Sequence, residues 1–213
     1  MYDIILFDLD GTITRSEIGI VNAIIYALSK FDIIPNDKEV LKKFIGPPLG
    51  QSFIKHFDFT EEKSKEAVTY CQKYMKEKGI YEAPLYDGIK EMLEILNSKG
   101  KRVFIATSKP EVFANQIIKY LQVEKYFEGI VGANLDGTRT DKAEIISILL
   151  EHYDIFDRSK VVMVGDREHD IYGAKSTNIN SIGVLYGYGE MEELVSAGAT
   201  HIVKTPQELL DFI

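Results

Sequence analysis

Short apolar segments rich in β-branched residues alternate with longer segments of helical periodicity, and this alternation restricts the fold more than any other feature of the chain. Strands are expected at residues 3–8, 102–107, 129–133, 160–166, 181–186 and 201–204. Helices are expected at residues 87–100, 110–121, 141–153, 170–177, 190–197 and 206–212. Strands and helices that alternate in this way pair in parallel through right-handed crossovers. The sequence therefore predicts an α/β fold with a doubly wound parallel sheet.

One interval breaks the alternation, because the residues between the first strand and the helix at 87–100 carry only helical signals. Asn36 with Glu39 resembles a capping box, and Thr60 is placed to cap a further helix. We therefore predict an inserted helical cap domain with hinges near residues 14–17 and 81–84. The predicted boundaries are 15–83 for the cap and 1–14 with 84–213 for the α/β core.

Composition narrows the class of protein. The 213 residues carry a net charge of −8, and an acidic chain offers no basic face to nucleic acid. No apolar run approaches the length of about 20 residues that spans a bilayer, and the first residues lack the basic region of a signal peptide. A single cysteine, Cys71, excludes an internal disulfide and a thiolate zinc cage. We expect a cytoplasmic monomer or weak homodimer without nucleic-acid or membrane partners.

Polar and charged side chains follow several of the strands, at the edge where open parallel sheets bind ligands. They come from distant parts of the sequence and comprise Asp8, Asp10, Thr107, Ser108, Lys142, Asp166 and Asp170. Clustered carboxylates stay ionised together only if a cation compensates them, and carboxylate oxygen is a preferred ligand of Mg²⁺. The sequence therefore predicts a Mg²⁺ site that includes Asp8 and Asp166.

The same set of residues indicates phosphoryl transfer. A carboxylate such as Asp8 can accept a phosphoryl group as a covalent nucleophile, and Asp10 is placed to exchange protons with the leaving oxygen and with water. Lys142 and Thr107 are expected to bind the charged phosphoryl oxygens. Ser108 is predicted either to contact phosphate or to cap the helix that begins near residue 110.

Several residues next to these candidates are not assigned to the site. Lys109 is expected at the surface. Glu168 and His169 are expected to face solvent or to pack against neighbours. Tyr186 and Tyr188 are interpreted as packing residues without a role in the site.

Four motifs in this order resemble those of the haloacid dehalogenase superfamily of phosphohydrolases. They are FDLDGT, FIATSK, TRTDK and VMVGDREHD, and the resemblance covers nearly the whole chain. It implies that Asp8 is the nucleophile, that Asp10 is the general acid and base, and that the backbone carbonyl of Asp10 also binds Mg²⁺. It further implies that Asp170 supports the metal or its waters, with Thr12 beside it, and that the insertion is a C1 cap.

A finer similarity is to phosphoglycolate phosphatases and related phosphatases named nucleotidases, carried by KKFIGPPLGQSF, TSKP and GVLYGYGEMEELVSAGATHIV. It makes Gly46 and Pro47 candidates for a specificity loop of the cap, although such residues also mark an ordinary helix stop. Two positions depart from the family's pattern. Ser108 stands where Asn is common, and Arg15, which changes the charge near a hinge, stands where Asp is common.

The predicted function is that of a Mg²⁺-dependent phosphomonoesterase. Its substrate would be a small phosphorylated metabolite, such as phosphoglycolate or a nucleoside monophosphate, hydrolysed through an aspartyl-phosphate. A phosphomutase of the β-phosphoglucomutase type would use the same core and return the phosphoryl group to the substrate. A receiver-like signalling protein has a similar sheet but is shorter and lacks the insertion, and a non-catalytic protein that binds a phosphorylated ligand is the third alternative.

Overall fold

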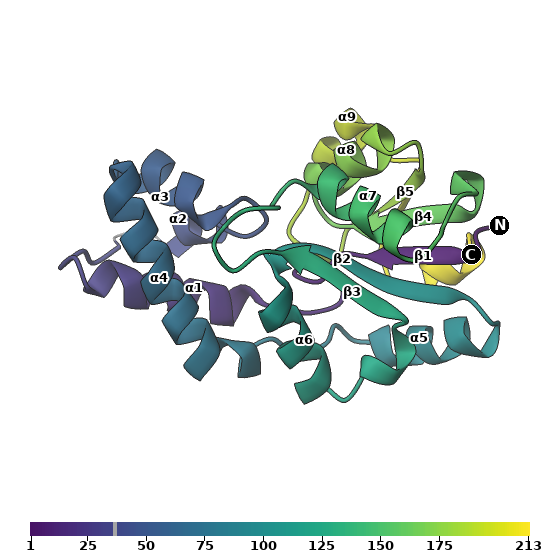
Figure 1. Ribbon diagram of the computed structural model, residues 1–213, viewed down its shortest axis with the longest axis horizontal. Helices are drawn as coiled ribbons and strands as arrows, with labels where there is room; N and C mark the ends of the chain where they lie inside the picture. Colours follow the sequence, from purple (N-terminus) through teal and green to yellow (C-terminus); the bar gives the residue numbers. More distant parts are fainter. Residues whose placement is uncertain (36–37) are drawn as a thin grey trace. The chain divides into compact units, whose positions relative to one another are not determined.

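The computed structural model describes residues 1–35 and 38–213, and these residues form two compact units (Figure 1). The α/β unit comprises Met1–Arg15 and Leu85–Ile213, and the helical unit comprises Ser16–Pro84. The capping box expected from Asn36 and Glu39 lies outside the described residues and side chains.

A parallel sheet of six strands, in the order β3-β2-β1-β4-β5-β6, forms the centre of the α/β unit. Its strands are β1 (Ile4–Phe7), β2 (Arg102–Pro110), β3 (Gly129–Ala133), β4 (Val161–Gly165), β5 (Asn180–Val184) and β6 (His201–Val203). The chain adds strands on one side of β1 and then on the other, so the strand order reverses between β1 and β4. This arrangement confirms the predicted doubly wound α/β fold.

The central strand, β1, aligns its carboxyl end with those of β2 and β4, the strands on either side of it. Ile5, Leu6 and Phe7 are fully buried, as expected for a parallel strand that is covered on both faces. Phe7 lies in register with Ile105 of β2 and with Val164 of β4. The segments that follow these three strands therefore leave the sheet at the same edge.

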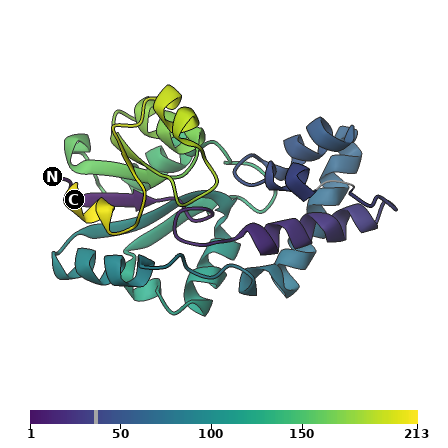
Figure 2. The same cartoon turned by 180° about the vertical axis from the view of Figure 1, so that it is seen from behind.

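Helices cover both faces of the sheet. In Figure 1, α7, α8 and α9 lie on one face, and α5 and α6 lie on the other. Their bounds are α5 (Ile89–Ser98), α6 (Glu111–Tyr120), α7 (Lys142–His152), α8 (Glu168–Ser176) and α9 (Met191–Ala197). Both chain termini lie at the opposite edge of the sheet from the carboxyl ends of the strands (Figures 1 and 2).

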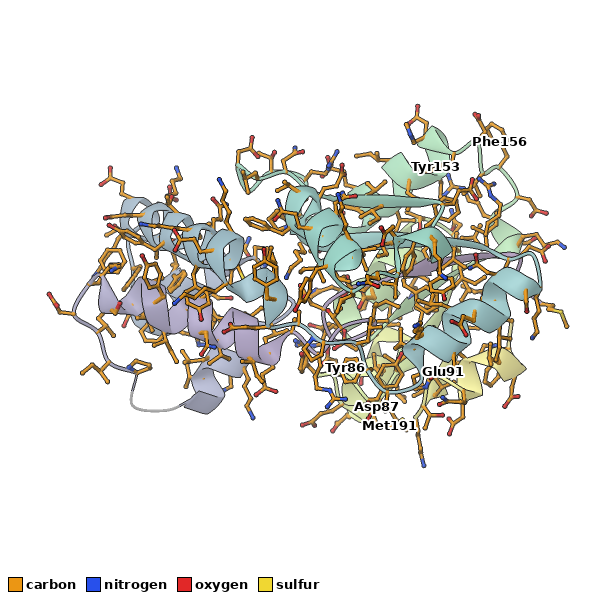
Figure 3. All side chains as sticks on the ribbon, turned by 90° about the horizontal axis from the view of Figure 1, so that it is seen from below. Tyr86, Asp87, Glu91, Tyr153, Phe156 and Met191 are labelled. Atoms are coloured by element: carbon orange, nitrogen blue, oxygen red, sulfur yellow. The ribbon has the colours of Figure 1, made fainter. Side chains whose placement is uncertain are left out.

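The core under α7 fixes that helix on the sheet. Its buried face includes Ile146 and Leu149, which pack with Leu6 of β1 and Phe104 of β2. Tyr153, labelled in Figure 3, follows α7 and places its ring 4.7 Å from that of Phe104. Since the first residue of α7 lies on the same buried face, this packing also sets the position of the helix start.

Several elements differ from the expectation from sequence, and three of these differences have the largest consequences for the fold. α8 begins at Glu168, two residues earlier than expected, because the carboxylate of Asp170 accepts the backbone N–H of Arg167 and closes the first turn. β2 continues past Thr107 to Pro110. The segment expected as a helix at 206–212 is a short 3-10 helix, Glu208–Asp211.

The helical unit contains α1 (Glu17–Ser29), α2 (Lys38–Lys42), α3 (Leu49–Phe57), α4 (Glu61–Glu77) and the short 3-10 helix η1 (Gly79–Tyr81). Thr60 caps α4, because its hydroxyl oxygen accepts the N–H of Lys63 at 3.2 Å. Gly46 and Pro47 lie in the connection between α2 and α3, where Gly46 has a φ of 102° that favours glycine. None of the described helices is both long and apolar enough to cross a membrane.

Replacing Leu149 by Ala is expected to lower the free energy of unfolding by about 2–5 kcal/mol, because the change leaves a cavity in the core under α7. Urea unfolding followed by circular dichroism measures this loss. Val195→Ala, at a side chain that is 59% exposed, is the matched control and should change stability by less than about 0.5 kcal/mol. Equal effects of the two substitutions would contradict the described core.

Candidate active site

A tight turn after β1 holds two carboxylates at the edge of the sheet. The backbone N–H of Asp8 donates to the Val164 carbonyl of β4 at 2.9 Å, so the strand ladder extends to this residue. The following turn closes on the Leu9 carbonyl, which accepts the N–H and the hydroxyl of Thr14. Asp8 is therefore fixed at the strand end, and Asp10 is carried by the turn.

The ammonium group of Lys142 joins two of the buried carboxylates. Its Nζ lies 2.7 Å from Asp8 Oδ1 and 2.9 Å from Asp170 Oδ1, and it donates to the Ala106 carbonyl at 2.9 Å. These contacts engage all three donors of the lysine. Asp141 caps α7 by accepting the N–H of Glu144, which fixes the helix start that carries Lys142.

Asp166 is fully buried after β4 and is oriented by the chain around it. Its Oδ2 accepts the backbone N–H of Tyr188 at 2.8 Å, and its Oδ1 accepts the Thr12 hydroxyl at 3.4 Å. A side chain on Gly187 or Gly189 would collide with the backbone or Cβ of Asp166, so both glycines allow this close approach.

Gly11 also allows the site to close around Asp166. Its φ is 90°, and a Cβ atom at this position would collide with the Asp166 carboxylate and would lie 2.7 Å from the Tyr188 ring. The sequence predicts only a packing role for Tyr188, whereas its backbone N–H orients Asp166. The repeated glycines of the YGYG sequence were the available signal for this close packing.

Three carboxylates have the spacing of a metal site. Oxygen atoms of Asp8, Asp166 and Asp170 lie within 4.8 Å of one another, and all three residues are buried. Both oxygens of Asp170 are engaged, one by Lys142 and the other by the N–H of Arg167. This geometry favours Asp8 and Asp166 as the ligands of an ion and Asp170 as their support.

Burial disfavours the ionised form of these carboxylates unless positive charge beyond that of the lysines lies close to them. Burial, together with the neighbouring carboxylates of Asp170 and Asp10, raises the pKa of Asp8 to about 6, against the opposing effect of Lys142. Burial likewise raises the pKa of Asp166 well above its usual value, and Asp170 and Asp8 add to the rise. Burial alone would lower the pKa of Lys142, but Asp170 and Asp8 outweigh it and the pKa is raised. The carboxylates of this site therefore favour a bound cation.

The charges of the site fit a divalent ion. Lys142 contacts Asp8 and Asp170, and a second lysine, Lys109, contacts Asp10. With Asp166, the four carboxylates and two ammonium groups leave two negative charges. Buried carboxylate oxygens with this excess of charge suit a hard ion such as Mg²⁺.

Lys109 was expected at the surface, and this expectation is wrong. Its side chain is only 6% exposed, and its Nζ lies 3.0 and 2.8 Å from the two carboxylate oxygens of Asp10. The extension of β2 beyond Thr107 turns this lysine toward the site. No sequence pattern marks that irregularity, and lysine side chains are rarely buried unless they are paired.

Thr107 and Ser108 lie at the end of β2. Thr107 is buried, and its hydroxyl oxygen accepts the N–H of Lys109 at 3.2 Å. The Ser108 hydroxyl donates to the Thr140 carbonyl at 3.0 Å, which ties β2 to the segment before Lys142. The expectation that Ser108 caps the next helix is wrong, because α6 begins at Glu111 without a side-chain cap.

Arg15 lies at the border of the α/β unit. Its guanidinium lies 3.6 Å from the carboxylate of Asp87 and 5.1 Å from the centre of the Tyr86 ring. The Tyr86 ring in turn packs at 5.1 Å on that of Tyr186, which agrees with the packing role expected for Tyr186. Figure 3 labels Tyr86 and Asp87 in this region.

Comparison with known proteins identifies the family of this chain. The family model described as haloacid dehalogenase-like hydrolase matches residues 5–184. A 5'-nucleotidase from Pseudomonas aeruginosa is 41% identical over 200 residues, which cover 94% of this chain and 90% of that protein. The crystal structure of a predicted phosphatase from Clostridium acetobutylicum is 43% identical, with a TM-score of 0.94, and the match covers 100% of this chain and 98% of that chain.

Other relatives are named for different activities. The tyrosine-protein kinase PtkA of Mycobacterium tuberculosis is 32% identical, over 92% of this chain and 67% of its own length. A phosphoglycolate phosphatase from Colwellia psychrerythraea is 27% identical, over 98% of this chain and 95% of that protein. The family is therefore shared by relatives of differing activity. By the span of the family match and by the identity to its relatives, the chain belongs to the haloacid dehalogenase-like hydrolase family.

Proposed function

We propose that this chain is a Mg²⁺-dependent phosphomonoesterase that hydrolyses a small phosphorylated metabolite through an aspartyl-phosphate on Asp8. The observation that carries the proposal is the position of the Asp8 carboxylate, which ends the central strand, contacts Lys142 at 2.7 Å and lies beside Asp166 and Asp170. A carboxylate held next to cationic groups is suited to form a covalent phosphoryl intermediate. Relatives named as phosphatases and as a nucleotidase support this reaction class.

The proposed holders of Mg²⁺ are the side chains of Asp8 and Asp166 and the backbone carbonyl of Asp10. When bound, the ion supplies positive charge to the phosphoryl oxygens during transfer. Asp166 is oriented for this role by the N–H of Tyr188, and Thr12 supports it from the turn after β1. Asp170 acts on the site through its contact with Lys142.

The proposed reaction has two displacements at phosphorus. A carboxylate oxygen of Asp8 forms a bond to phosphorus while the bond to the leaving oxygen breaks, and Asp10, in its protonated carboxyl form, donates its proton to that oxygen. The Asp10 carboxylate then takes a proton from water, which attacks phosphorus and breaks the bond to Asp8. Lys142, Thr107 and Ser108 are proposed to bind the phosphoryl oxygens in both steps.

The proposed substrate is a phosphoglycolate-like metabolite or a nucleoside monophosphate. Relatives are named for such activities, among them a 5'-nucleotidase and a phosphoglycolate phosphatase. We propose that the helical unit acts as a cap that excludes bulk water and selects the leaving group, with Gly46 and Pro47 in a specificity loop. Arg15 is a further candidate for an influence on specificity, through its position at the border of the unit.

A screen of phosphate release over a library of phosphorylated metabolites, with and without Mg²⁺, tests the proposed activity. The library includes phosphoglycolate and nucleoside monophosphates, and each reaction is also analysed for isomerised products. Release of free phosphate that requires Mg²⁺ supports the phosphomonoesterase. An isomerised sugar phosphate without free phosphate would instead indicate a phosphomutase, and no turnover of any ester would contradict both.

Replacing Asp8 by Asn is expected to reduce phosphate release to the level of a blank without enzyme, because the amide cannot form the aspartyl-phosphate. Circular dichroism should show that the fold is retained. Asp211→Asn, at an exposed carboxylate in the final 3-10 helix, is the matched control and should keep wild-type turnover. Substantial turnover by the Asp8 variant would refute the proposed nucleophile.

Chelation of divalent ions with EDTA is expected to abolish phosphate release, and added Mg²⁺ should restore it. Because an ion that binds only the folded state stabilises it, Mg²⁺ at about 100 times its Kd should add about 2.7 kcal/mol to the free energy of unfolding. Asp166→Asn should remove this stabilisation, whereas Asp211→Asn should keep it. Stabilisation by Mg²⁺ that is unchanged in Asp166→Asn would contradict the proposed metal site.

A further inference from the structure

We propose that Lys109 is a positioning residue, which fixes the carboxylate of Asp10 in the orientation that proton transfer requires. This inference rests on the proposed function, in which Asp10 serves both displacements. The Nζ atom of Lys109 lies 3.0 Å from Oδ1 and 2.8 Å from Oδ2 of Asp10, and the two side chains are 6% and 14% exposed. One ammonium that contacts both oxygens restricts the rotation of the carboxylate as well as its position.

An irregularity in β2 aims Lys109 at Asp10. Thr107 pairs with Gly132 of β3, but the next pair joins Pro110 to Ala133, so β2 has two residues more than β3 between these pairs. Bulges of this kind redirect side chains and are common beside active sites. The N–H of Lys109 donates to the Thr107 hydroxyl at 3.2 Å, which fixes the backbone of the bulge.

The close packing of β3 holds the bulge in place. A Cβ atom on Gly132 would lie 2.7 Å from the Lys109 carbonyl oxygen and 2.9 Å from Glu111 Cα. The N–H of Gly132 donates to the Glu111 carboxylate, which also contacts Arg139 at 3.0 Å. Contacts on both sides of the bulge therefore fix the direction in which Lys109 leaves the strand.

Lys142 contacts other partners in this structure. Its three donors are engaged by Asp8, Asp170 and the Ala106 carbonyl. Asp10, in contrast, is carried by a turn beyond the strand end and receives its cation from Lys109. The two lysines thus serve different carboxylates, one at the proposed nucleophile and one at the proposed general acid and base.

Loss of Lys109 should affect catalysis because proton transfer from Asp10 takes place only over a short distance. A general acid must lie within hydrogen-bond distance of the oxygen that it protonates, and displacement by about 1 Å can cost about 100-fold in rate. Loss of Lys109 should therefore slow the displacement of an alkoxide, which needs a proton as it leaves. It should have little effect on the displacement of p-nitrophenolate, which is stable as an anion.

The test compares kcat/KM of wild type and Lys109→Met for an alkyl phosphate that the wild type hydrolyses and for p-nitrophenyl phosphate. This parameter reports the steps up to departure of the leaving group, so hydrolysis of the aspartyl-phosphate does not enter it. We expect a loss of about 10-fold to 100-fold for the alkyl ester and of less than about 3-fold for p-nitrophenyl phosphate. Lys109→Gln, which keeps a hydrogen-bond donor without the charge, should give a smaller loss with the same preference, and it replaces the Met variant if that variant does not fold.

Lys101→Met is the matched control. Lys101 directly precedes β2, its side chain is 9% exposed, and it contacts the Asp3 carboxylate at 3.2 Å, so it is also a largely buried lysine in an ion pair. The control should leave kcat/KM for both esters within about 2-fold of wild type. If it reproduced the pattern of Lys109→Met, the positioning role would be excluded.

A double-mutant cycle separates positioning from a direct contact with the substrate. Because Lys109 acts through Asp10, adding Lys109→Met to Asp10→Asn should change kcat/KM for the alkyl ester by less than about 2-fold. Equal losses on the two esters, additive losses in the double variant, or a gain of activity in Lys109→Met would overturn the inference. None of these results would contradict the proposed function. Absence of phosphate release by the wild type would instead contradict both the proposed function and the positioning role of Lys109.

Discussion

The contact of one buried ammonium, that of Lys142, with two carboxylates is the interaction on which the site depends. Removal of a carboxylate from water is costly, and a buried carboxylate persists in its ionised form only with compensating charge and hydrogen bonds. Lys142 supplies both to Asp8 and Asp170, at 2.7 and 2.9 Å. Its position is determined by the apolar face of α7, which packs on the sheet and includes the lysine at its first residue. Core packing and site electrostatics are thus linked through one helix.

The strand order explains why residues distant in sequence meet at this point. β1 lies between β2 and β4, and the segment after each of these strands reaches the same edge of the sheet. Glycines then allow the backbone to approach the carboxylates closely, as Gly11 and Gly187 do at Asp166. The result is a compact set of charges with an excess of two negative charges, which accounts for the proposed need for a divalent ion.

Much of this arrangement could be predicted because strands and helices have distinct periodicities, and because the ends of parallel strands are where ligands bind. Asp8 and Asp166 were assigned to one site on that basis, and the structure places them together. The role of Lys109 could not be predicted, since it depends on a bulge that forms only when β2 pairs with β3. The contact of Tyr188 with Asp166 was missed for a similar reason, because it joins two loops through backbone atoms that carry little sequence signal.

The central claim is that a carboxylate oxygen of Asp8 bonds to phosphorus during turnover. The most direct test is rapid acid quenching of a single turnover with Mg²⁺, followed by mass spectrometry of the intact protein and of its peptides. We predict a transient gain of one phosphoryl group on the peptide that contains Asp8, labile to hydroxylamine as expected for an acyl phosphate. Release of free phosphate without any phosphorylated enzyme, or with the phosphoryl group on another residue, would contradict the account.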